Sequence, residues 1–221
     1  YSFKTFLKQA GKDFYNQSVN PPVVRASTII FKSMQHLRKT QVKAQKNPTG
    51  GYYDYGRQGT STTYILQKIL TKLEESYHVF LTPTGFGSVF LAMFSVVRPG
   101  DEILVSEPVY RTTRILTPDY IKEFKIRTKF YDPPNLNTLE KSITKKTKLI
   151  FVENPGSNTF DFQDLGKIIT IAKREKILTA IDNTWATPYF LKPIKIGFDM
   201  SIVSATKYYS GHSDVMGGSL A

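Results

Sequence analysis

The stretch "KLIFVENPGSNTFDFQDLGKIITIAKREKILTAIDN", residues 148–183, holds two short apolar runs with a helical pattern between them. "KLIFVEN" and "ILTAIDN" have the length and the β-branched content of strands, and "FQDLGKIITIAKREK" is long enough for a helix. A crossover helix between two strands is the usual connection of a parallel pair. The stretch therefore predicts an α/β domain.

The same alternation continues on both sides of this stretch. Further strand-like runs are "HVFLT", "EILVS", "KIRTKFY" and "SIVSAT", and further helical candidates are "GSVFLAMFSVV", "YRTTRIL" and "NLNTLEKSI". We predict a mostly parallel sheet with helices on both faces over residues 51–221, since strands that alternate with helices form covered parallel sheets.

The first part of the chain has a different character. Pro21 and Pro22 interrupt it, and the turn-forming "AQKNPTGG" closes it, so residues 1–50 are predicted to form an N-terminal arm. The segment "GTSTTYILQKILTKLEES" then predicts a helix, for which Ser61 or Thr62 can serve as the cap.

Composition excludes several classes of protein. The chain has 221 residues, is 40% hydrophobic and lacks cysteine, which permits one sizeable core but neither a disulfide framework nor a thiolate metal site, and we predict no metal. No apolar stretch approaches the roughly 20 residues that span a bilayer, and the first residues lack a signal-peptide pattern. We expect a cytoplasmic protein without a membrane partner.

The formal charge of +12 raises the question of nucleic acid. The lysines are dispersed among glutamates in runs such as "LQKILTKLEES" and "IAKREK", and no basic stripe with interleaved aromatic residues is present. We therefore predict a solvated lysine-rich surface and no nucleic-acid partner.

Polar residues follow the predicted strands, where open α/β sheets bind their ligands. They are Gly85 to Ser88, Glu153 and Asn154, Asp182, and Ser204, Thr206 and Lys207. Each has an ordinary alternative, because a glycine-rich turn is often only a turn and most lysines are solvated. Together they supply a helix start for a phosphate, an acid for a protonated ring nitrogen and a lysine for a Schiff base. These are the parts of a pyridoxal phosphate site.

Four stretches carry a family resemblance, namely "YYDYGRQGTSTTYILQ", "ENPGSNTFD", "IDNTWATPYF" and "SATKYYSGHSDVMGG". They resemble the Cys/Met-metabolism family of fold-type I pyridoxal phosphate enzymes, over nearly the whole chain. The resemblance implies that Lys207 binds the cofactor and moves the α-proton of the substrate. It also implies that Asp182 holds the pyridinium nitrogen and that Tyr110 stacks on the ring and assists proton transfer.

The same resemblance implies which residues bind the phosphate of the cofactor. The amides of Gly85 and Phe86 and the hydroxyls of Ser204 and Thr206 would hold it. Tyr55 and Arg57, two apart in an extended arm, would reach the phosphate of a neighbouring subunit. Shared sites of this kind require at least a dimer, and a homotetramer is the expected assembly.

Within the family the resemblance is strongest to the cystathionine β-lyase branch. "YGRQGTSTTYILQ", "PGS" and Trp185 favour it, and the implied reaction converts cystathionine to homocysteine, pyruvate and ammonia in methionine biosynthesis. Asn154 departs from the branch pattern and is expected to affect how the ring oxygen is held. The γ-synthase and γ-lyase activities remain the alternative.

The last residues, "MGGSLA", are expected to lie in a strand of the large domain. Family members continue with a small C-terminal domain that supplies an arginine for the substrate carboxylate, and this sequence has no counterpart of it. The chain is accordingly expected to be either a fragment or a truncated, non-catalytic remnant of such an enzyme.

Overall fold

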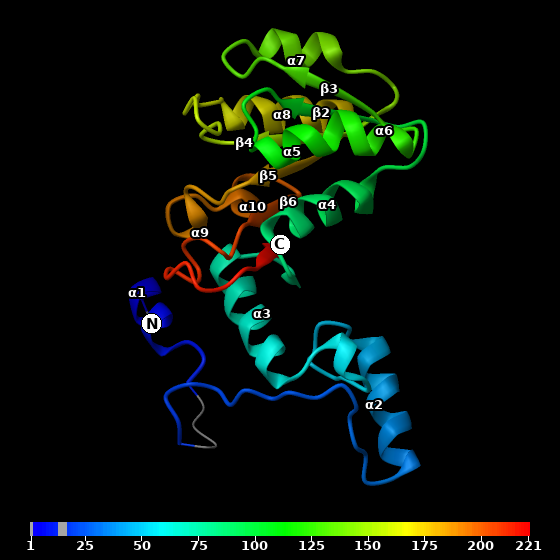
Figure 1. The fold of residues 1–221 in the computed structure, drawn as a ribbon, viewed down its shortest axis with the longest axis vertical. Coiled ribbons are helices and arrows are strands. Elements are labelled where there is room, and N and C mark those ends of the chain that lie inside the picture. The colour runs from blue at the N-terminus through cyan, green and yellow to red at the C-terminus, as the bar shows by residue number, and fades with distance from the viewer. Residues whose placement is uncertain (1, 13–16) are drawn as a thin grey trace. The chain divides into compact units, whose positions relative to one another are not determined.

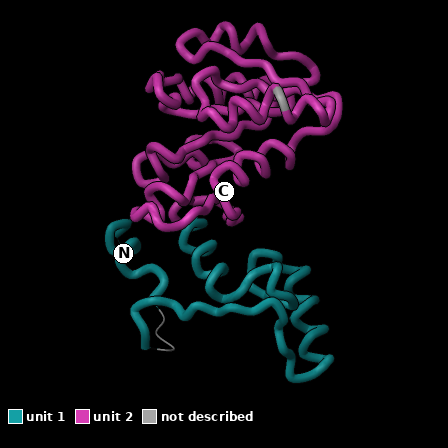
Figure 2. Tube along the Cα trace, in the orientation of Figure 1, with its two compact units in different colours: residues 1–72 teal, residues 73–221 magenta. Residues whose placement is uncertain are grey.

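A computed structural model describes residues 2–12 and 17–221 of the chain (Figure 1). Residues 1 and 13–16, which belong to the N-terminal stretch read above, lie outside the described residues. The chain forms two compact units, residues 1–72 and 73–221 (Figure 2). The division into an arm and a large domain near residue 50 stays a prediction.

A seven-stranded sheet is the centre of the second unit, in the order β1-β7-β6-β5-β4-β2-β3. The strands are β1 (Phe80–Thr82), β2 (Glu102–Ser106), β3 (Arg127–Tyr131), β4 (Thr147–Glu153), β5 (Leu178–Asp182), β6 (Met200–Val203) and β7 (Gly218–Leu220). β3, β2, β4, β5 and β6 pair in parallel, whereas β7 is antiparallel to both β6 and β1. The predicted mostly parallel sheet is confirmed.

Helices cover both faces of this sheet, as predicted. The helices of the second unit are α4 (Gly85–Val96), α5 (Arg111–Ile115), the π-helix η2 (Leu116–Tyr120), α6 (Ile121–Glu123), α7 (Leu136–Ser142), α8 (Leu165–Glu175), α9 (Thr187–Phe190) and α10 (Pro193–Ile196). α4, α5, α7 and α8 match the helical patterns in the sequence. The remaining helices, which are short, were not predicted.

The strand pleat explains why two cores form. Leu149 and Phe151 of β4 pack with Met93 of α4 in one cluster, while Ile150 of β4 packs with Ile168 of α8 in another. Successive side chains of a strand point to opposite faces, so a strand that is apolar at every position must be covered on both. The two clusters hold the sheet rigidly and fix where its strands end.

The first unit contains more helix than the arm prediction allowed. Its helices are α1 (Phe3–Gln9), α2 (Met34–Lys46), the short 3₁₀ helix η1 (Gly56–Gln58) and α3 (Ser61–Glu74), the last residues of which enter the second unit. No residue of α2 is buried, and its N-terminus is capped by Ser33, which accepts a hydrogen bond from the His36 amide. The prediction missed α2 because most of its residues are polar or charged.

The start of α3 differs from the prediction that Ser61 or Thr62 caps this helix. The Thr60 carbonyl accepts the Tyr64 amide at 3.0 Å, so Thr60 occupies the cap position expected for Ser61 or Thr62. The Thr62 hydroxyl is used elsewhere. It accepts the Val24 amide at 2.8 Å and donates to the Pro22 carbonyl at 3.0 Å, which ties the proline-containing segment to α3.

Among the described residues, no helix is long and apolar enough to cross a bilayer.

Candidate functional site

The loops that follow β1 and β6 meet at one edge of the sheet. β1 is antiparallel to β7 and β7 is antiparallel to β6, so β1 and β6 run in the same direction and end at the same edge. A Cβ atom built on Gly85 would lie 2.5 Å from the Ser204 Oγ. The structure therefore brings together the glycine turn and the hydroxyl that the sequence analysis assigned to a phosphate.

Helix α4 begins at this contact. The Thr84 hydroxyl caps it by accepting the Gly87 amide at 2.9 Å, which leaves the Gly85 and Phe86 amides at the helix start. Amides at this position have no acceptor within the helix, and the helix dipole favours an anion beside them. The Ser88 hydroxyl is not available to such an anion, because it is buried and lies 2.7 Å from the Thr82 hydroxyl.

The lysine loop, residues 204–217, connects β6 to β7 and is closed by its own hydrogen bonds. The Thr206 amide and hydroxyl both donate to the Gly217 carbonyl at 3.2 Å, and the Gly217 amide donates to the Thr206 hydroxyl at 3.1 Å. The hydroxyl expected to hold a phosphate is thus engaged within the loop. Ser204, which faces Gly85, is better placed for that contact.

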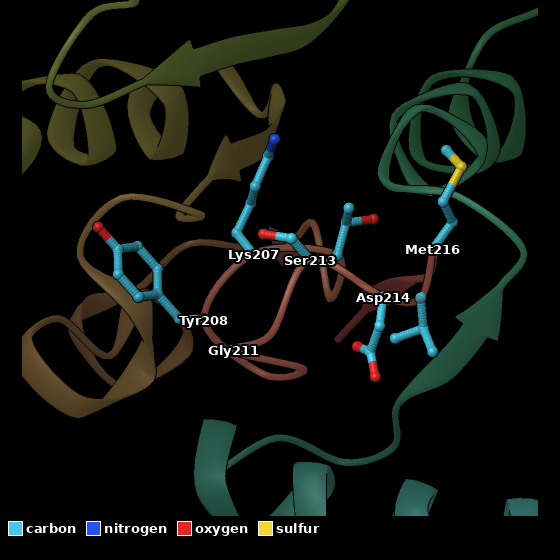
Figure 3. A pocket seen from close by; sticks show the side chains of 8 residues that line it. Lys207, Tyr208, Gly211, Ser213, Asp214 and Met216 are labelled. Atoms are coloured by element: carbon cyan, nitrogen blue, oxygen red, sulfur yellow. The ribbon is translucent and has the colours of Figure 1, made fainter.

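A cavity of about 590 Å³ opens beside the lysine loop (Figure 3). It is lined by Thr206, Lys207, Tyr208, Gly211, Ser213, Asp214, Val215 and Met216. The Lys207 side chain is exposed and rises from the loop with its amine directed away from Asp214 (Figure 3). The amine is therefore free to react with a ligand at the strand ends.

Two carboxyl groups end neighbouring strands of the sheet. Glu153 of β4 and Asp182 of β5 are register partners, and Asp182 accepts the Thr184 amide at 3.0 Å. Burial raises the pKa of Asp182, although hydrogen bonds from Thr184 oppose the rise. Burial, and then the neighbouring Asp182, raise the pKa of Glu153 to about 8, against hydrogen bonds from Tyr110 and Ser157.

Within the described part of the chain, no ion pair joins either carboxylate to a lysine or arginine. A buried pair of acids without a cation favours the protonated forms, and a cationic ligand beside the two groups would allow both to ionise. The arrangement thus selects for a positively charged group at the ends of β4 and β5.

Tyr110 is held at this edge by its backbone. Its amide donates to the Glu153 carboxylate at 2.6 Å, and its side chain is 55% exposed just before α5. The ring is therefore anchored through one of the two acids and remains free to stack on a ligand. The sequence analysis named Tyr110 but did not anticipate that Glu153 positions it.

Thr184 is a connecting residue that the sequence analysis missed. Its amide donates to Asp182, and its hydroxyl accepts the Ser204 amide at 2.8 Å. One residue therefore joins the acid at the end of β5 to the start of the lysine loop. The available signal was the polar residue two positions after Asp182 in "IDNTW", a spacing at which aspartate often accepts a backbone amide.

Asn154 has a structural contact that the sequence did not predict. Its side-chain oxygen is buried and accepts the Gln163 amide at 2.8 Å, and the Gln163 side chain donates to the Glu153 carbonyl at 3.0 Å. Asn154 thus organises the loop after β4 through its side-chain oxygen, and its expected effect on a ring oxygen stays a prediction.

Tyr55 and Arg57 belong to the first unit and do not lie in a uniformly extended arm. Tyr55 is extended and bridges Thr28, but Arg57 lies within η1. The Gly56 amide donates to the Ser27 carbonyl at 2.9 Å, and this close approach turns the chain. The Arg57 guanidinium lies 5.6 Å from the centre of the Tyr55 ring, so the two side chains do fall on the same side.

Residues 4–221 match the family described as Cys/Met metabolism PLP-dependent enzyme. The chain belongs to this family. It is 37% identical to a Rhizobium johnstonii protein named as a candidate cystathionine beta-lyase, over 98% of this chain and 53% of the relative. The chain spans about half the length of the curated relatives it matches.

Solved structures agree with this membership. A candidate O-acetylhomoserine (thiol)-lyase from Campylobacter jejuni has a TM-score of 0.89 and 29% identity, covers 100% of this chain over 53% of its own, and carries an N'-pyridoxyl-lysine-5'-monophosphate. Cystathionine gamma-lyase from Lactobacillus plantarum, complexed with L-serine, has a TM-score of 0.88 and 28% identity, over 100% of this chain and 55% of its own. The fold is that of fold-type I enzymes, and the cofactor of the family is pyridoxal 5'-phosphate.

The residues present fit this cofactor. The unpaired acids at the ends of β4 and β5 suit its pyridinium nitrogen, and the first amides of α4 with Ser204 suit its phosphate. The exposed Lys207 suits its aldehyde. No cluster of three metal-ligating side chains occurs in residues 2–12 and 17–221.

Proposed function

We propose that this chain forms the cofactor-binding part of a carbon–sulfur lyase that acts on cystathionine. The reaction breaks the bond between Cβ and sulfur, and water then completes the conversion to homocysteine, pyruvate and ammonia. The observation that carries the proposal is the acid pair of Asp182 and Glu153 at one sheet edge with Lys207 and the start of α4. When bound, pyridoxal phosphate supplies an electron sink for the charge left at Cα.

In this proposal the residues of the chain have distinct tasks. Lys207 bonds to the cofactor and afterwards takes the α-proton of the substrate amino acid. Asp182 keeps the ring nitrogen protonated, and the Tyr110 ring stacks on the cofactor and assists the proton transfer. The Gly85 and Phe86 amides, together with the Ser204 hydroxyl, bind the phosphate, and Thr206 supports them by closing the lysine loop.

The assembly belongs to the proposal as well. Tyr55 and Arg57 bind the phosphate of a neighbouring subunit, so the enzyme is at least a dimer and in its full form a homotetramer. Their stacked arrangement, with the guanidinium 5.6 Å from the ring centre, suits two side chains that reach one phosphate. The proposal includes a cytoplasmic location and a role in methionine biosynthesis.

A γ-elimination or γ-replacement activity is the second candidate. The likeness to a cystathionine gamma-lyase structure favours it. "PGS" at residues 155–157 and Trp185 favour the β-lyase, as do relatives named cystathionine beta-lyase. The products decide between them, because β-elimination of cystathionine gives pyruvate and homocysteine, whereas γ-elimination gives cysteine and 2-oxobutyrate.

The assignment of Lys207 can be tested directly. The chain is incubated with pyridoxal phosphate, reduced with borohydride and digested, and the labelled peptide is identified by mass spectrometry. We expect the label on Lys207, none in Lys207→Ala, and a normal label in the exposed-site control Lys145→Ala. A label on any other lysine would contradict the proposed site.

The reaction itself is tested by product analysis. The chain is joined to the C-terminal portion of a β-lyase and incubated with cystathionine, and the products are identified.

A further inference from the structure

A buried acid lies behind the lysine loop, outside the site described above. Glu74 is the last residue of α3, belongs to the second unit and is 0% exposed. Its carboxylate accepts a hydrogen bond from the Tyr209 hydroxyl at 3.2 Å. Tyr209 lies two residues after Lys207, so this contact connects the lysine loop to the end of a helix far away in sequence.

Polar and charged groups surround Glu74 from several elements. Tyr209 approaches from the lysine loop, the Ser201 hydroxyl from β6, and the Lys192 ammonium from the segment before α10. Lys192 also pairs with the adjacent Glu75, which Lys195 approaches at 3.5 Å. Lys192 and Lys195 thus form ion pairs with Glu75, and Tyr209 donates its hydrogen bond to Glu74.

The protonation state of Glu74 can change near neutral pH. Burial raises its pKa to about 7, against the nearby Ser201 hydroxyl, the hydrogen bond from Tyr209 and the charge of Lys192. The pKa of Tyr209 is raised by its own burial and by Glu74, so the phenol keeps its proton and remains the donor. A hydrogen bond to an ionised carboxylate is stronger than one to a neutral carboxyl group. The bond from Tyr209 is therefore strongest when Glu74 is ionised, whereas burial of the carboxylate favours its neutral form, so the protonation state of Glu74 changes how the loop is held.

We propose that Glu74 and Tyr209 are positioning residues that tie the lysine loop to residue 74, within the second unit, and thereby set where the Lys207 amine stands. This inference rests on the proposed role of Lys207. The loop is otherwise closed by bonds between its own residues, such as those from Ser210 to Ala205 and from Gly211 to Lys207. Those bonds fix its internal shape. The bond from the Ser204 amide to Thr184 holds the start of the loop, and the bond from Tyr209 to Glu74 holds its middle.

Two readouts test the proposal on the same proteins. The first is the protection of loop amides against hydrogen–deuterium exchange between pH 6 and pH 8.5, which needs no cofactor. The second is the rate at which pyridoxal phosphate becomes reducible onto Lys207. Tyr209→Phe removes one hydroxyl, Glu74→Gln keeps an acceptor without a charge, and Tyr77→Phe is the matched control, since Tyr77 is 85% exposed.

In Tyr209→Phe we expect the protection of the loop amides and the labelling rate of Lys207 to fall on the order of tenfold at pH 8, because the variant loses a hydrogen bond to a charged acceptor. In Glu74→Gln we expect loop protection that no longer changes with pH around 7, and Tyr77→Phe should match the wild type. Wild-type behaviour of Tyr209→Phe in both readouts would overturn the positioning role. A wild-type chain that takes no label at Lys207 would instead refute the proposed function, whatever the loop exchange shows.

Discussion

At the scale of single residues, the acid pair of Glu153 and Asp182 has the clearest physical consequence. Burial raises the pKa of both carboxyl groups, and for Glu153 the charge of the neighbouring Asp182 adds to the rise. In the free chain the pKa of Glu153 is about 8, above the 4.5 of an ordinary glutamate. Glu153 therefore costs no folding stability below pH 4.5, and stability is lost as the pH rises from there through 8.

A cationic ring beside the pair reverses this effect. It lowers the pKa of Glu153, so binding of the cofactor near pH 7 should release a proton from that side chain. Calorimetric titration in two buffers of different ionisation enthalpy measures the protons released. Glu153→Gln should release about one proton fewer than the wild type, whereas Glu140→Gln, at a distant surface ion pair, should release the same number. Equal proton release from Glu153→Gln and the wild type would place the bound cation elsewhere.

Much of this residue-level site could be inferred from the sequence. Asp182 and Lys207 were expected to follow neighbouring strands, and β5 and β6 do pair. The contact of Thr184 with Ser204 and that of Glu74 with Tyr209 could not be found in this way, because the two residues of each pair are far apart in the sequence. Local patterns report which face a residue occupies, and they carry no information on which remote side chain it meets.

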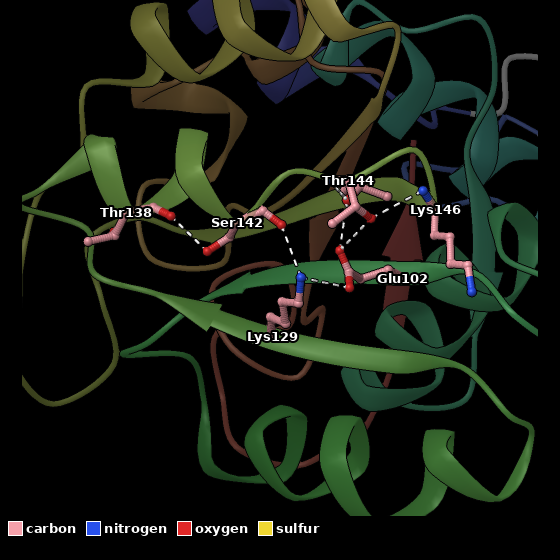
Figure 4. Close-up of polar contacts among 7 residues, drawn as sticks. Glu102, Lys129, Thr138, Ser142, Thr144 and Lys146 are labelled. Atoms are coloured by element: carbon pink, nitrogen blue, oxygen red, sulfur yellow. Dashed lines mark hydrogen bonds and ion pairs between the residues drawn. The ribbon is translucent and has the colours of Figure 1, made fainter.

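At the scale of elements, a buried polar network fixes the edge of the sheet opposite the site (Figure 4). Glu102 at the start of β2 receives the Lys129 ammonium at 2.9 Å and the Thr147 and Thr144 hydroxyls at 2.9 and 3.2 Å. Burial opposes its ionisation, but Lys129 and the two hydroxyls outweigh burial, so the pKa of Glu102 lies below its usual value. The network joins the first residues of β2 and β4 to Lys129 in the middle of β3.

Glu102→Gln should therefore destabilise the fold by about 2 kcal/mol at pH 7, since it leaves Lys129 without its counter-charge. The stabilisation is present above the ordinary glutamate pKa of 4.5 and is lost as the pH falls through the lower pKa of the folded state. Urea unfolding at pH 7 and pH 3 measures both effects. Glu140→Gln breaks a more exposed pair with Arg174 and should cost at most about 1 kcal/mol. Equal losses in the two variants would contradict a structural role of the network.

The sequence pattern predicted those helices and strands that pack in a core, because packing requires apolar side chains at regular intervals. β2, β4 and β5 are buried at most positions, and their apolar runs were visible in the sequence. α2 buries no residue, and η2 and α6 extend the short α5 without a period of their own. Such elements are set by capping and by neighbouring segments rather than by apolar periodicity.

At the scale of the whole molecule, the proposed site needs residues from two chains. Lys207 and the acid pair belong to residues 73–221, whereas Tyr55 and Arg57 belong to residues 1–72. If the arginine reaches the phosphate of a neighbouring subunit, each site of a dimer combines the second unit of one chain with the first unit of its partner. A two-fold dimer then contains two such sites.

Mixed dimers separate this arrangement from a site within one chain. An Arg57→Ala chain keeps its lysine, and a Lys207→Ala chain keeps its arginine, so a hybrid should hold one site with both groups. Random mixing in equal amounts makes about half of the dimers hybrids and should restore about a quarter of wild-type sites. The measurement is the cofactor fixed on Lys207 by borohydride after tagged chains are shown to form hybrids. Labelling no higher than that of Arg57→Ala alone would place Arg57 in its own subunit or outside the site, and failure of the wild-type chain to form dimers would remove the shared site altogether.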